Sequence, residues 1–160
     1  MAQEIERKFL VSNDLWRNQI SSSSHITQGY LTASGTTVRV RVRDDQAFLT
    51  IKGKAVGITR SEYEYSIPVT EAKEMLSTLA LDPPVEKIRY IVPAENGLVW
   101  EVDEYLGGNA PLFTAEIELP SEDSTFDRPQ WLGKEISDDS RYTNRALSRK
   151  PYSLWQDDEK

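Results

Sequence analysis

Charged side chains occupy every second position in several short stretches of this chain. Near the N-terminus, Glu4, Glu6 and Lys8 alternate with Ile5 and Arg7. Residues two apart on a β-strand point to the same face of the sheet, so these three charged groups share one face. Carboxylate oxygens are the hard ligands that Mg²⁺ or Mn²⁺ favours, and the first stretch therefore indicates metal chemistry.

Pairs of like charge at this spacing recur along the sequence, and their sign changes from one stretch to the next. These pairs are Arg39 and Arg41, Glu62 and Glu64, Lys87 and Arg89, Glu101 and Asp103, and Glu116 and Glu118, and Lys52 stands alone. A solvated sheet face with cross-strand ion pairs is the simplest alternative, but such a face usually mixes polar residue types. Like charges so close repel each other, so we expect counter-ions from outside: divalent cations for the carboxylates and a polyanion for the basic groups. Arginine forks suit phosphate oxygens in particular.

Period-two alternation predicts that these charged stretches lie on strands. Eight strands are expected, over residues 5–11, 26–32, 37–43, 48–52, 61–68, 86–92, 99–105 and 114–119. Helices are expected over 13–20, 71–79 and 142–149, with residue 70 as the N-cap of the second, and a loop over 21–24. Turn residues between neighbouring strands favour antiparallel pairing, so the chain is mainly β with a few helices.

An eight-stranded antiparallel sheet can close into a barrel whose interior holds one small ligand. Closure would place the charged faces inside and the apolar faces outside, where the helices would cover them. Buried charges are costly unless they are paired, hydrated or bound to a ligand, so this inside-out barrel predicts a ligand site.

Composition limits the other interpretations. A chain of 160 residues without a linker fits one domain, expected over residues 1–155, followed by an acidic tail over 156–160 with nothing to pack against. A net charge of −7 argues against a partner held by the nucleic-acid backbone. The absence of cysteine and of any long apolar stretch predicts a cytoplasmic protein without a membrane partner. His25 is the only histidine, which excludes a histidine-rich metal site.

The ordered motifs resemble those of the CYTH superfamily, the triphosphate tunnel metalloenzymes, and in particular its short bacterial members similar to inorganic triphosphatases. The matching motifs are Glu4-x-Glu6-x-Lys8, Arg39-x-Arg41, Thr50-Ile51-Lys52-Gly53, Glu62-Tyr63-Glu64, Lys87-Ile88-Arg89-Tyr90, Glu101-Val102-Asp103, Glu116-Ile117-Glu118, Gly133-Lys134-Glu135-Ile136 and Tyr142-x-Asn144. ExExK alone would be a weak signal, whereas the whole ordered series covers nearly the entire chain.

This resemblance implies roles for individual residues. The metal ligands and acidic wall implied are Glu4, Glu6, Glu62, Glu64, Asp103, Glu116 and Glu118. The triphosphate cradle implied is Lys8, Arg39, Arg41, Lys52, Lys87, Arg89 and Lys134. Lys8, Asp103 and Tyr30 are the implied catalytic residues, with Tyr30 similar to the tyrosine that pairs with the ExExK lysine. The roles of Arg43, Lys54 and Glu101 stay open.

The implied activity is hydrolysis of a triphosphate, most simply inorganic triphosphate to diphosphate and phosphate, with Mg²⁺ or Mn²⁺ as cofactor and no covalent intermediate. The alternatives within the same resemblance are a class IV adenylate cyclase, a thiamine triphosphatase and a nucleoside triphosphatase. A polyphosphate- or nucleotide-binding module without turnover is the non-enzyme alternative. The sequence leaves a homodimer open.

Overall fold

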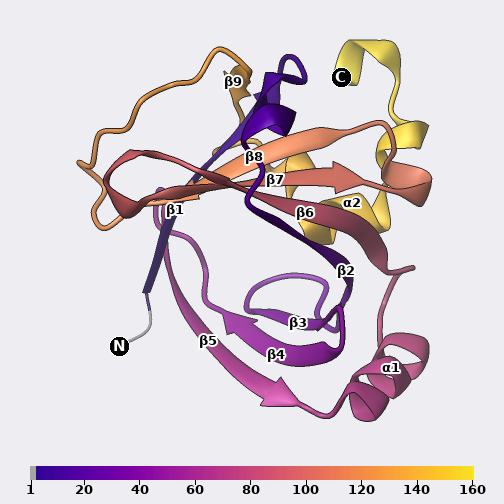
Figure 1. The fold of residues 1–160 in the computed structure, drawn as a ribbon. Coiled ribbons are helices and arrows are strands. Elements are labelled where there is room, and N and C mark those ends of the chain that lie inside the picture. Colours follow the sequence, from indigo (N-terminus) through magenta and orange to yellow (C-terminus); the bar gives the residue numbers. More distant parts are fainter. Residues whose placement is uncertain (1–2) are drawn as a thin grey trace.

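The computed structural model describes residues 3–160. Nine strands form the framework of the fold (Figure 1). They are β1 (Gln3–Val11), β2 (Ser22–Tyr30), β3 (Thr37–Arg43), β4 (Gln46–Lys52), β5 (Thr59–Ile67), β6 (Val85–Pro93), β7 (Val99–Tyr105), β8 (Phe113–Glu118) and β9 (Leu132–Glu135). The α-helices are α1 (Val69–Thr78) and α2 (Asn144–Arg149). Short 3₁₀ turns are η1 (Leu15–Gln19), η2 (Glu95–Gly97), η3 (Gly107–Asn109), η4 (Ser140–Tyr142), η5 (Tyr152–Leu154) and η6 (Asp157–Glu159).

Eight of the strands close into an antiparallel barrel, as the alternation predicts. The order is β5-β4-β3-β2-β6-β7-β8-β1-β9, and β5 also pairs with β1, opposite Gln3, Glu4 and Ile5. Further along β1, the same edge of the strand pairs instead with the short β9, which therefore lies outside the eight-stranded ring. Closure removes most of the free sheet edge and forces the two sheet faces into an inside and an outside.

The strand register gathers the charged residues on the inner face. Glu6 lies opposite Glu118, and Lys8 lies opposite Glu116, on the pair β1–β8. Residues directly opposite each other in an antiparallel pair share one face. By the same rule, Arg89 on β6 and Asp103 on β7 lie on one face of the sheet, because they are opposite each other.

The apolar side chains lie outside the barrel, where other segments cover them. Around β1, β7 and β8, a core of Phe9, Trp100 and Ile117 is closed by Trp16 of η1 and Trp131 of the long loop before β9. α1 packs against β3 and β4, where Ala72 contacts the cluster of Val40 and Ala47. At one end of the barrel, α2, η4 and η5 cover a third cluster that includes Tyr105, Leu147 and Trp155. The inside-out arrangement is confirmed.

Three local expectations are wrong. Residues 22–24 extend β2 rather than forming a loop, because Ser22, Ser23 and Ser24 pair with β6 despite their poor strand propensity. The expected first helix is reduced to the single 3₁₀ turn η1. α1 begins at Val69 with Pro68 as N-cap, two residues before the expected cap position, 70.

The C-terminal segments also differ from the prediction. The third helix begins only at Asn144, where the Thr143 hydroxyl caps it by accepting a hydrogen bond from the Ala146 amide at 3.1 Å. The last residues have packing partners, since the Glu159 carboxylate pairs with Lys150 at 3.0 Å and its carbonyl accepts from Arg141 at 2.6 Å. Within residues 3–160, no helix is both long and apolar enough to cross a bilayer.

Candidate active site

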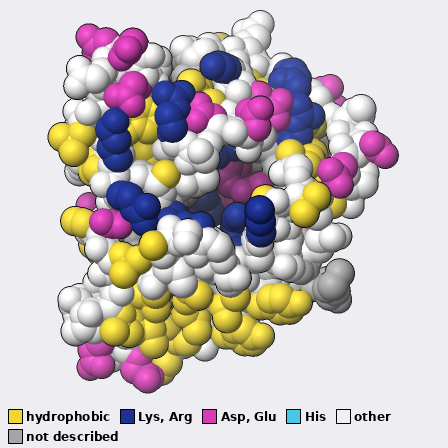
Figure 2. Space-filling view, turned by 180° about the vertical axis from the view of Figure 1, so that it is seen from behind, with side chains coloured by type: hydrophobic (Ala, Val, Ile, Leu, Met, Phe, Trp, Pro, Cys, Tyr) yellow, Lys and Arg dark blue, Asp and Glu magenta, His cyan; other side chains and the backbone are white. Residues whose placement is uncertain are grey.

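A cavity of about 560 Å³ lies inside the barrel. The space-filling view shows it as a hollow with acidic side chains deep inside and Lys and Arg side chains around it (Figure 2). Of the fifteen residues to which the resemblance gives a role, twelve line it: Glu4, Glu6, Lys8, Tyr30, Arg39, Arg41, Lys52, Glu62, Glu64, Arg89, Glu116 and Glu118. The barrel therefore brings the two kinds of charge to one space.

The basic part of the wall is built on β3 and its neighbours. The Arg41 Nε donates to the Gln28 carboxamide oxygen at 2.8 Å, and the Gln28 amide donates to the Tyr30 hydroxyl at 2.7 Å. Arg39 donates to Thr50 at 3.1 Å. The neutral partner of Arg41 orients its guanidinium group without neutralising it, whereas Arg39 also lies 3.6 Å from the Glu64 carboxylate. Burial and the nearby charge of Arg39 lower the pKa of Arg41 to about 9, so this wall favours a bound anion.

The acidic part of the wall is crowded with carboxylates. Burial and the Glu116 carboxylate raise the pKa of Glu6 well above its usual value, and burial and a hydrogen bond to Glu4 raise the pKa of Glu62 to about 7. Lys52 neutralises only part of this charge, with its ammonium 2.9 Å from the Glu4 carboxylate. Because carboxyl groups that repel one another give up protons reluctantly, a cation would stabilise their charged forms.

The donor set fits a hard divalent cation. Glu4, Glu6, Glu116 and Glu118 are oxygen ligands on the neighbouring strands β1 and β8, and all four border the cavity. Over the part of the chain that the structure describes, no three such side chains already converge to hold an ion. A bound cation would therefore have to draw the carboxylates together from their present positions.

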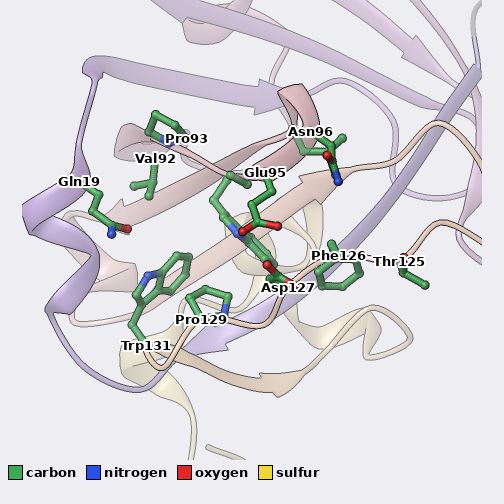
Figure 3. A pocket seen from close by; sticks show the side chains of 13 residues that line it. Gln19, Val92, Pro93, Glu95, Asn96, Thr125, Phe126, Asp127, Pro129 and Trp131 are labelled. Carbon is green, nitrogen blue, oxygen red and sulfur yellow. The ribbon is translucent and has the colours of Figure 1, made fainter.

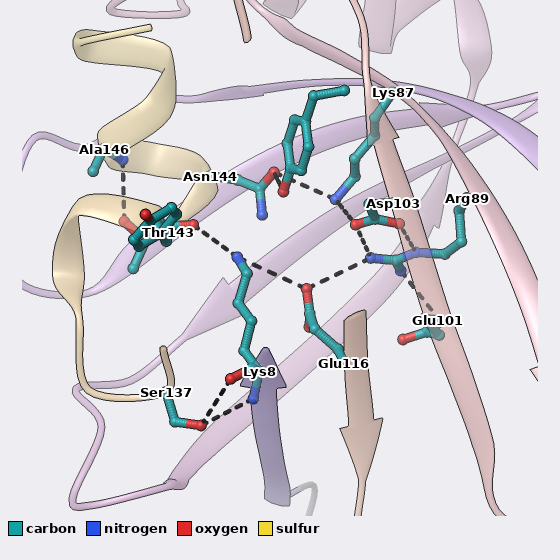
Figure 4. Close-up of polar contacts among 12 residues, drawn as sticks. Lys8, Lys87, Arg89, Glu101, Asp103, Glu116, Ser137, Thr143, Asn144 and Ala146 are labelled. Atoms are coloured by element: carbon teal, nitrogen blue, oxygen red, sulfur yellow. Dashed lines mark hydrogen bonds and ion pairs between the residues drawn. The ribbon is translucent and has the colours of Figure 1, made fainter. Parts of the chain in front are cut away.

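Two predicted ligands lie behind the cavity wall rather than on it. Asp103 and Lys87 are fully buried, 2.7 Å apart, and neither borders the cavity (Figure 4). Arg89 donates from Nε to one Asp103 oxygen at 2.8 Å and from Nη2 to the other at 2.9 Å. Burial acts to raise the pKa of Asp103, but the charges of Arg89 and Lys87 hold it well below its usual range. In this arrangement the carboxylate of Asp103 is occupied in holding Arg89 at the wall, not in meeting a metal.

Lys8 and Tyr30 both border the cavity but have different partners. The Lys8 ammonium donates to the Tyr142 carbonyl at 2.7 Å and lies 4.0 Å from Glu116. The Tyr30 hydroxyl accepts from Gln28. Among the contacts of the described residues, none joins Lys8 to Tyr30, so the pairing suggested by the resemblance is not seen.

Comparison with known proteins agrees with the strand motifs and the barrel. The model of the CYTH domain family matches residues 2–148. The chain belongs to the CYTH domain family. An inorganic triphosphatase of Acetivibrio thermocellus is 46% identical over 158 residues, covering 98% of this chain and 100% of that protein. An inorganic triphosphatase of Nitrosomonas europaea is 38% identical over 149 residues, covering 91% and 96%. A crystal structure of an inorganic triphosphatase superposes with a TM-score of 0.65 at 34% identity, covering 98% of this chain and 97% of the other.

Lys134 does not reach the cavity of this CYTH domain. It lies exposed on β9, the strand outside the ring, and does not border the cavity. Lys54 is also exposed and outside the cavity, whereas Arg43 and Glu101 line it. Glu101 lies 3.3 Å from Arg89, so it contributes to the setting of that guanidinium.

Sequence reasoning misses further cavity residues of the CYTH domain. Arg60 lies on the inner face of β5, two positions before Glu62, and its buried Nε has no hydrogen-bond partner. The alternation would have predicted Arg60 as an inner residue if the expected strand had begun at residue 59 rather than at 61. Arg145 comes from α2, and no strand pattern could have pointed to it, whereas its neighbour Asn144, which belongs to the motif Tyr142-x-Asn144, also lines the cavity.

Proposed function

We propose that this protein hydrolyses inorganic triphosphate to diphosphate and phosphate with a divalent metal as cofactor. The observation that carries the proposal is a single cavity bordered both by the guanidinium groups of Arg39 and Arg41 on β3 and by crowded carboxylates on β1 and β8. A compact polyanion accompanied by a cation satisfies both walls at once. The activity named for the two relatives, at 46% and 38% identity, supports the same substrate.

The basic residues bind and orient the substrate in this proposal. Arg39, Arg41 and Arg89 hold successive phosphoryl oxygens through N–H groups that no carboxylate fully occupies, and Lys8 and Lys52 add charge at the acidic side. In phosphoryl transfer there is little covalent chemistry for the protein to perform, so holding the chain in line and neutralising its charge supply most of the rate. Water attacks directly, without a covalent intermediate.

The carboxylates provide the metal site in this proposal. Glu4, Glu6, Glu116 and Glu118 would hold Mg²⁺ or Mn²⁺, with Glu62 and Glu64 as the adjoining acidic wall. When bound, the ion would supply Lewis-acid stabilisation of phosphoryl oxygens and a more acidic water. Asp103 acts as a positioning residue, because its two carboxylate oxygens accept from Nε and Nη2 of Arg89.

The lining of the cavity favours inorganic triphosphate over substrates with a base or a thiazole ring. Among the described residues, Tyr30 and Tyr142 are the aromatic side chains that border the cavity, and the Tyr30 hydroxyl is held by Gln28. An adenylate cyclase, a thiamine triphosphatase or a nucleoside triphosphatase needs an additional ring platform. A pure binding module has no use for so many carboxylates, which would repel the anion.

Phosphate release from tripolyphosphate, ATP, thiamine triphosphate and diphosphate tests the proposal, with each substrate assayed with Mg²⁺, Mn²⁺, Ca²⁺ or EDTA. We expect release from tripolyphosphate to be fastest, to require Mg²⁺ or Mn²⁺ and to stop in EDTA. Absence of release from tripolyphosphate with every metal would refute it. Formation of cyclic AMP from ATP would identify the cyclase instead.

The remaining assignments are also proposals. We propose a cytoplasmic protein whose partner is the small triphosphate, since its chain has no cysteine and a net charge of −7. The domain boundary at residue 155, the absence of nucleic-acid binding and the homodimer stay predictions. Limited proteolysis, gel shift and light scattering would test them in that order.

A further inference from the structure

The side chain of Asn144 contacts the buried ion pair of Lys87 with Asp103 and also borders the interior cavity. Asn144 is the first residue of α2, and Lys87 lies fully buried behind the cavity wall. The carboxamide oxygen of Asn144 accepts from the Lys87 ammonium at 3.3 Å and from the Tyr105 hydroxyl at 2.9 Å. Because an ammonium group only donates hydrogen bonds, the oxygen must face Lys87 and the amide nitrogen must face away from it.

The amide nitrogen of Asn144 has two N–H donors and no acceptor for either. A carboxamide oxygen has two lone pairs, and Lys87 and Tyr105 occupy both, whereas the nitrogen makes no hydrogen bond within residues 3–160. This nitrogen is not among the fully buried polar atoms that lack a partner, so it is accessible. Figure 4 shows it turned away from Lys87, in the direction of the Lys8 ammonium. Both donors are therefore available to a ligand in the cavity.

The start of α2 holds Asn144 in this orientation. The Thr143 hydroxyl caps the helix by accepting from the Ala146 amide at 3.1 Å. On the other side of the cap, the Tyr142 carbonyl accepts from the Lys8 ammonium at 2.7 Å, so the same segment also positions Lys8. A donor that is fixed before its ligand arrives loses little conformational entropy on binding.

We propose that Asn144 is a substrate-binding residue, whose amide group donates to a non-bridging phosphoryl oxygen of the triphosphate beside Lys8. This role rests on the proposed function and adds a neutral donor to the charged cradle. Phosphoryl oxygens accept strongly, and an amide donates to them without forming ion pairs with the carboxylates of the cavity. Asn144 does not suit a metal, because its single ligand oxygen already accepts from Lys87 and Tyr105.

The alternative is a structural role, in which Asn144 only supports Lys87. Asn144→Asp separates the two roles, because it keeps an oxygen acceptor for Lys87 and Tyr105 but replaces the N–H donors by a second acceptor. A structural role predicts that this variant keeps both the Tm and the kcat/KM of the parent. If Asn144 binds substrate, we expect the Tm to stay close to that of the parent. The kcat/KM for tripolyphosphate with Mg²⁺ should fall by about tenfold or more, as for a lost hydrogen bond to a charged group.

Asn144→Asp also adds a negative charge, so Ser140→Asp is its matched control. Ser140 is exposed and borders the same cavity, and its hydroxyl makes no hydrogen bond within residues 3–160. We expect Asn144→Asp to lose more kcat/KM than Ser140→Asp, since only the first variant loses donors. Asn144→Ala removes the donors without adding charge and should also lower kcat/KM.

The parent is assayed beside the three variants, with thermal melting and circular dichroism of each. A parent that released no phosphate would refute the proposed function itself. With an active parent, the role of Asn144 would be overturned if Asn144→Asp lost no more kcat/KM than Ser140→Asp. The same conclusion would follow if Asn144→Ala kept the kcat/KM of the parent.

Discussion

Arg41 carries an uncompensated charge on the cavity wall, since its hydrogen-bond partner Gln28 is neutral. Arg41→Ala should therefore remove contacts made to phosphate in both the ground state and the transition state. We expect KM to rise and kcat to fall together, with kcat/KM lower by roughly ten- to hundredfold, from one or two charge-assisted hydrogen bonds. Steady-state phosphate release from tripolyphosphate measures this.

The matched control for Arg41→Ala is Lys73→Ala, which removes one positive charge from the exposed face of α1. Its kinetics should equal those of the parent. If Arg41→Ala raised KM and left kcat unchanged, Arg41 would contribute only uniform binding, and its proposed part in catalysis would be wrong.

Glu4 and Glu6 test the metal site. Glu4→Gln or Glu6→Gln keeps the shape of the side chain and removes the charge, so the fold should remain while metal binding weakens. We expect kcat to fall by about a hundredfold or more, because losing even the residues behind metal ligands commonly costs ten- to hundredfold. Isothermal titration with Mn²⁺ and circular dichroism, beside Glu71→Gln as control, separate weakened binding from unfolding. Full turnover in both variants would contradict the metal assignment.

The strands show which features of the fold the alternation of residue types can predict. It predicts the eight barrel strands and their inner faces because period two is fixed by the pleat and the inner positions are rich in charge. It cannot distinguish Arg89, at the cavity, from Asp103, behind it, since both occupy inner positions of β6 and β7. Packing decides that difference: Asn144 of α2 accepts from Lys87 at 3.3 Å and from Tyr105 at 2.9 Å, closing the space above the buried ion pair.

The buried group of Lys87, Asp103 and Arg89 joins β6 to β7, and Asp103 is its fully buried anion. Asp103→Asn would leave two buried cations without their main counter-charge. We expect the free energy of unfolding to fall by about 3–5 kcal/mol, the usual cost of breaking a buried ion pair. Urea denaturation measures it, with the neighbouring Glu104→Gln as control, whose carboxylate accepts from Tyr90. Equal midpoints for the two variants would show that the pair contributes little.

The closed barrel was predictable from its strands, but the full set of residues that line its cavity was not. Closure follows from seven strands with a charged face among the eight, because only a common interior gives their like charges shared counter-ions. Arg145 enters the cavity from α2, and a second cavity, outside the barrel, is lined partly by the loop over residues 125–131, which has no repeating pattern (Figure 3). Both features depend on how segments that are distant in the sequence pack together. The alternation of residue types within single strands carries no information about that packing.

The crowded carboxylates predict how the metal-free protein responds to pH. The pKa values of Glu6, Glu62 and Glu118 are raised in the folded state, by burial first and then by neighbouring carboxyl groups, with Glu62 at about 7. The folded state therefore binds more protons than the unfolded chain between about pH 5 and 7, and stability falls as pH rises through that window. The lowered pKa values of Glu116 and Asp103 act only in more acidic solution, and burial lowers the pKa of Lys87 to about 7, so its opposite effect on stability begins only at the upper end of this window.

Thermal melting in EDTA at constant ionic strength checks this from pH 5 to 7. We expect the Tm to decrease towards pH 7, and the decrease to be smaller in Glu62→Gln, which cannot ionise. A Tm that is flat or that rises over the same interval would show that the carboxylates do not repel one another in the folded protein.

The barrel interior holds like charges on several strand faces, and its internal ion pairs, such as Lys52 with Glu4 and Arg39 with Glu64, offset only part of their repulsion. A ligand that binds only the folded state stabilises it by mass action, by about 2.7 kcal/mol at a hundredfold excess over its Kd. Tripolyphosphate with Mg²⁺ should therefore raise the Tm of a slowly hydrolysing variant such as Glu4→Gln, and of the parent in Ca²⁺ if turnover is slow there. Sulfate at matched ionic strength provides screening and a single tetrahedral anion, which offers fewer oxygens to Arg39, Arg41 and Arg89 than a triphosphate chain does. Equal shifts with the two anions would mean that the cavity responds to charge in general, and the proposed polyphosphate site would have to be abandoned.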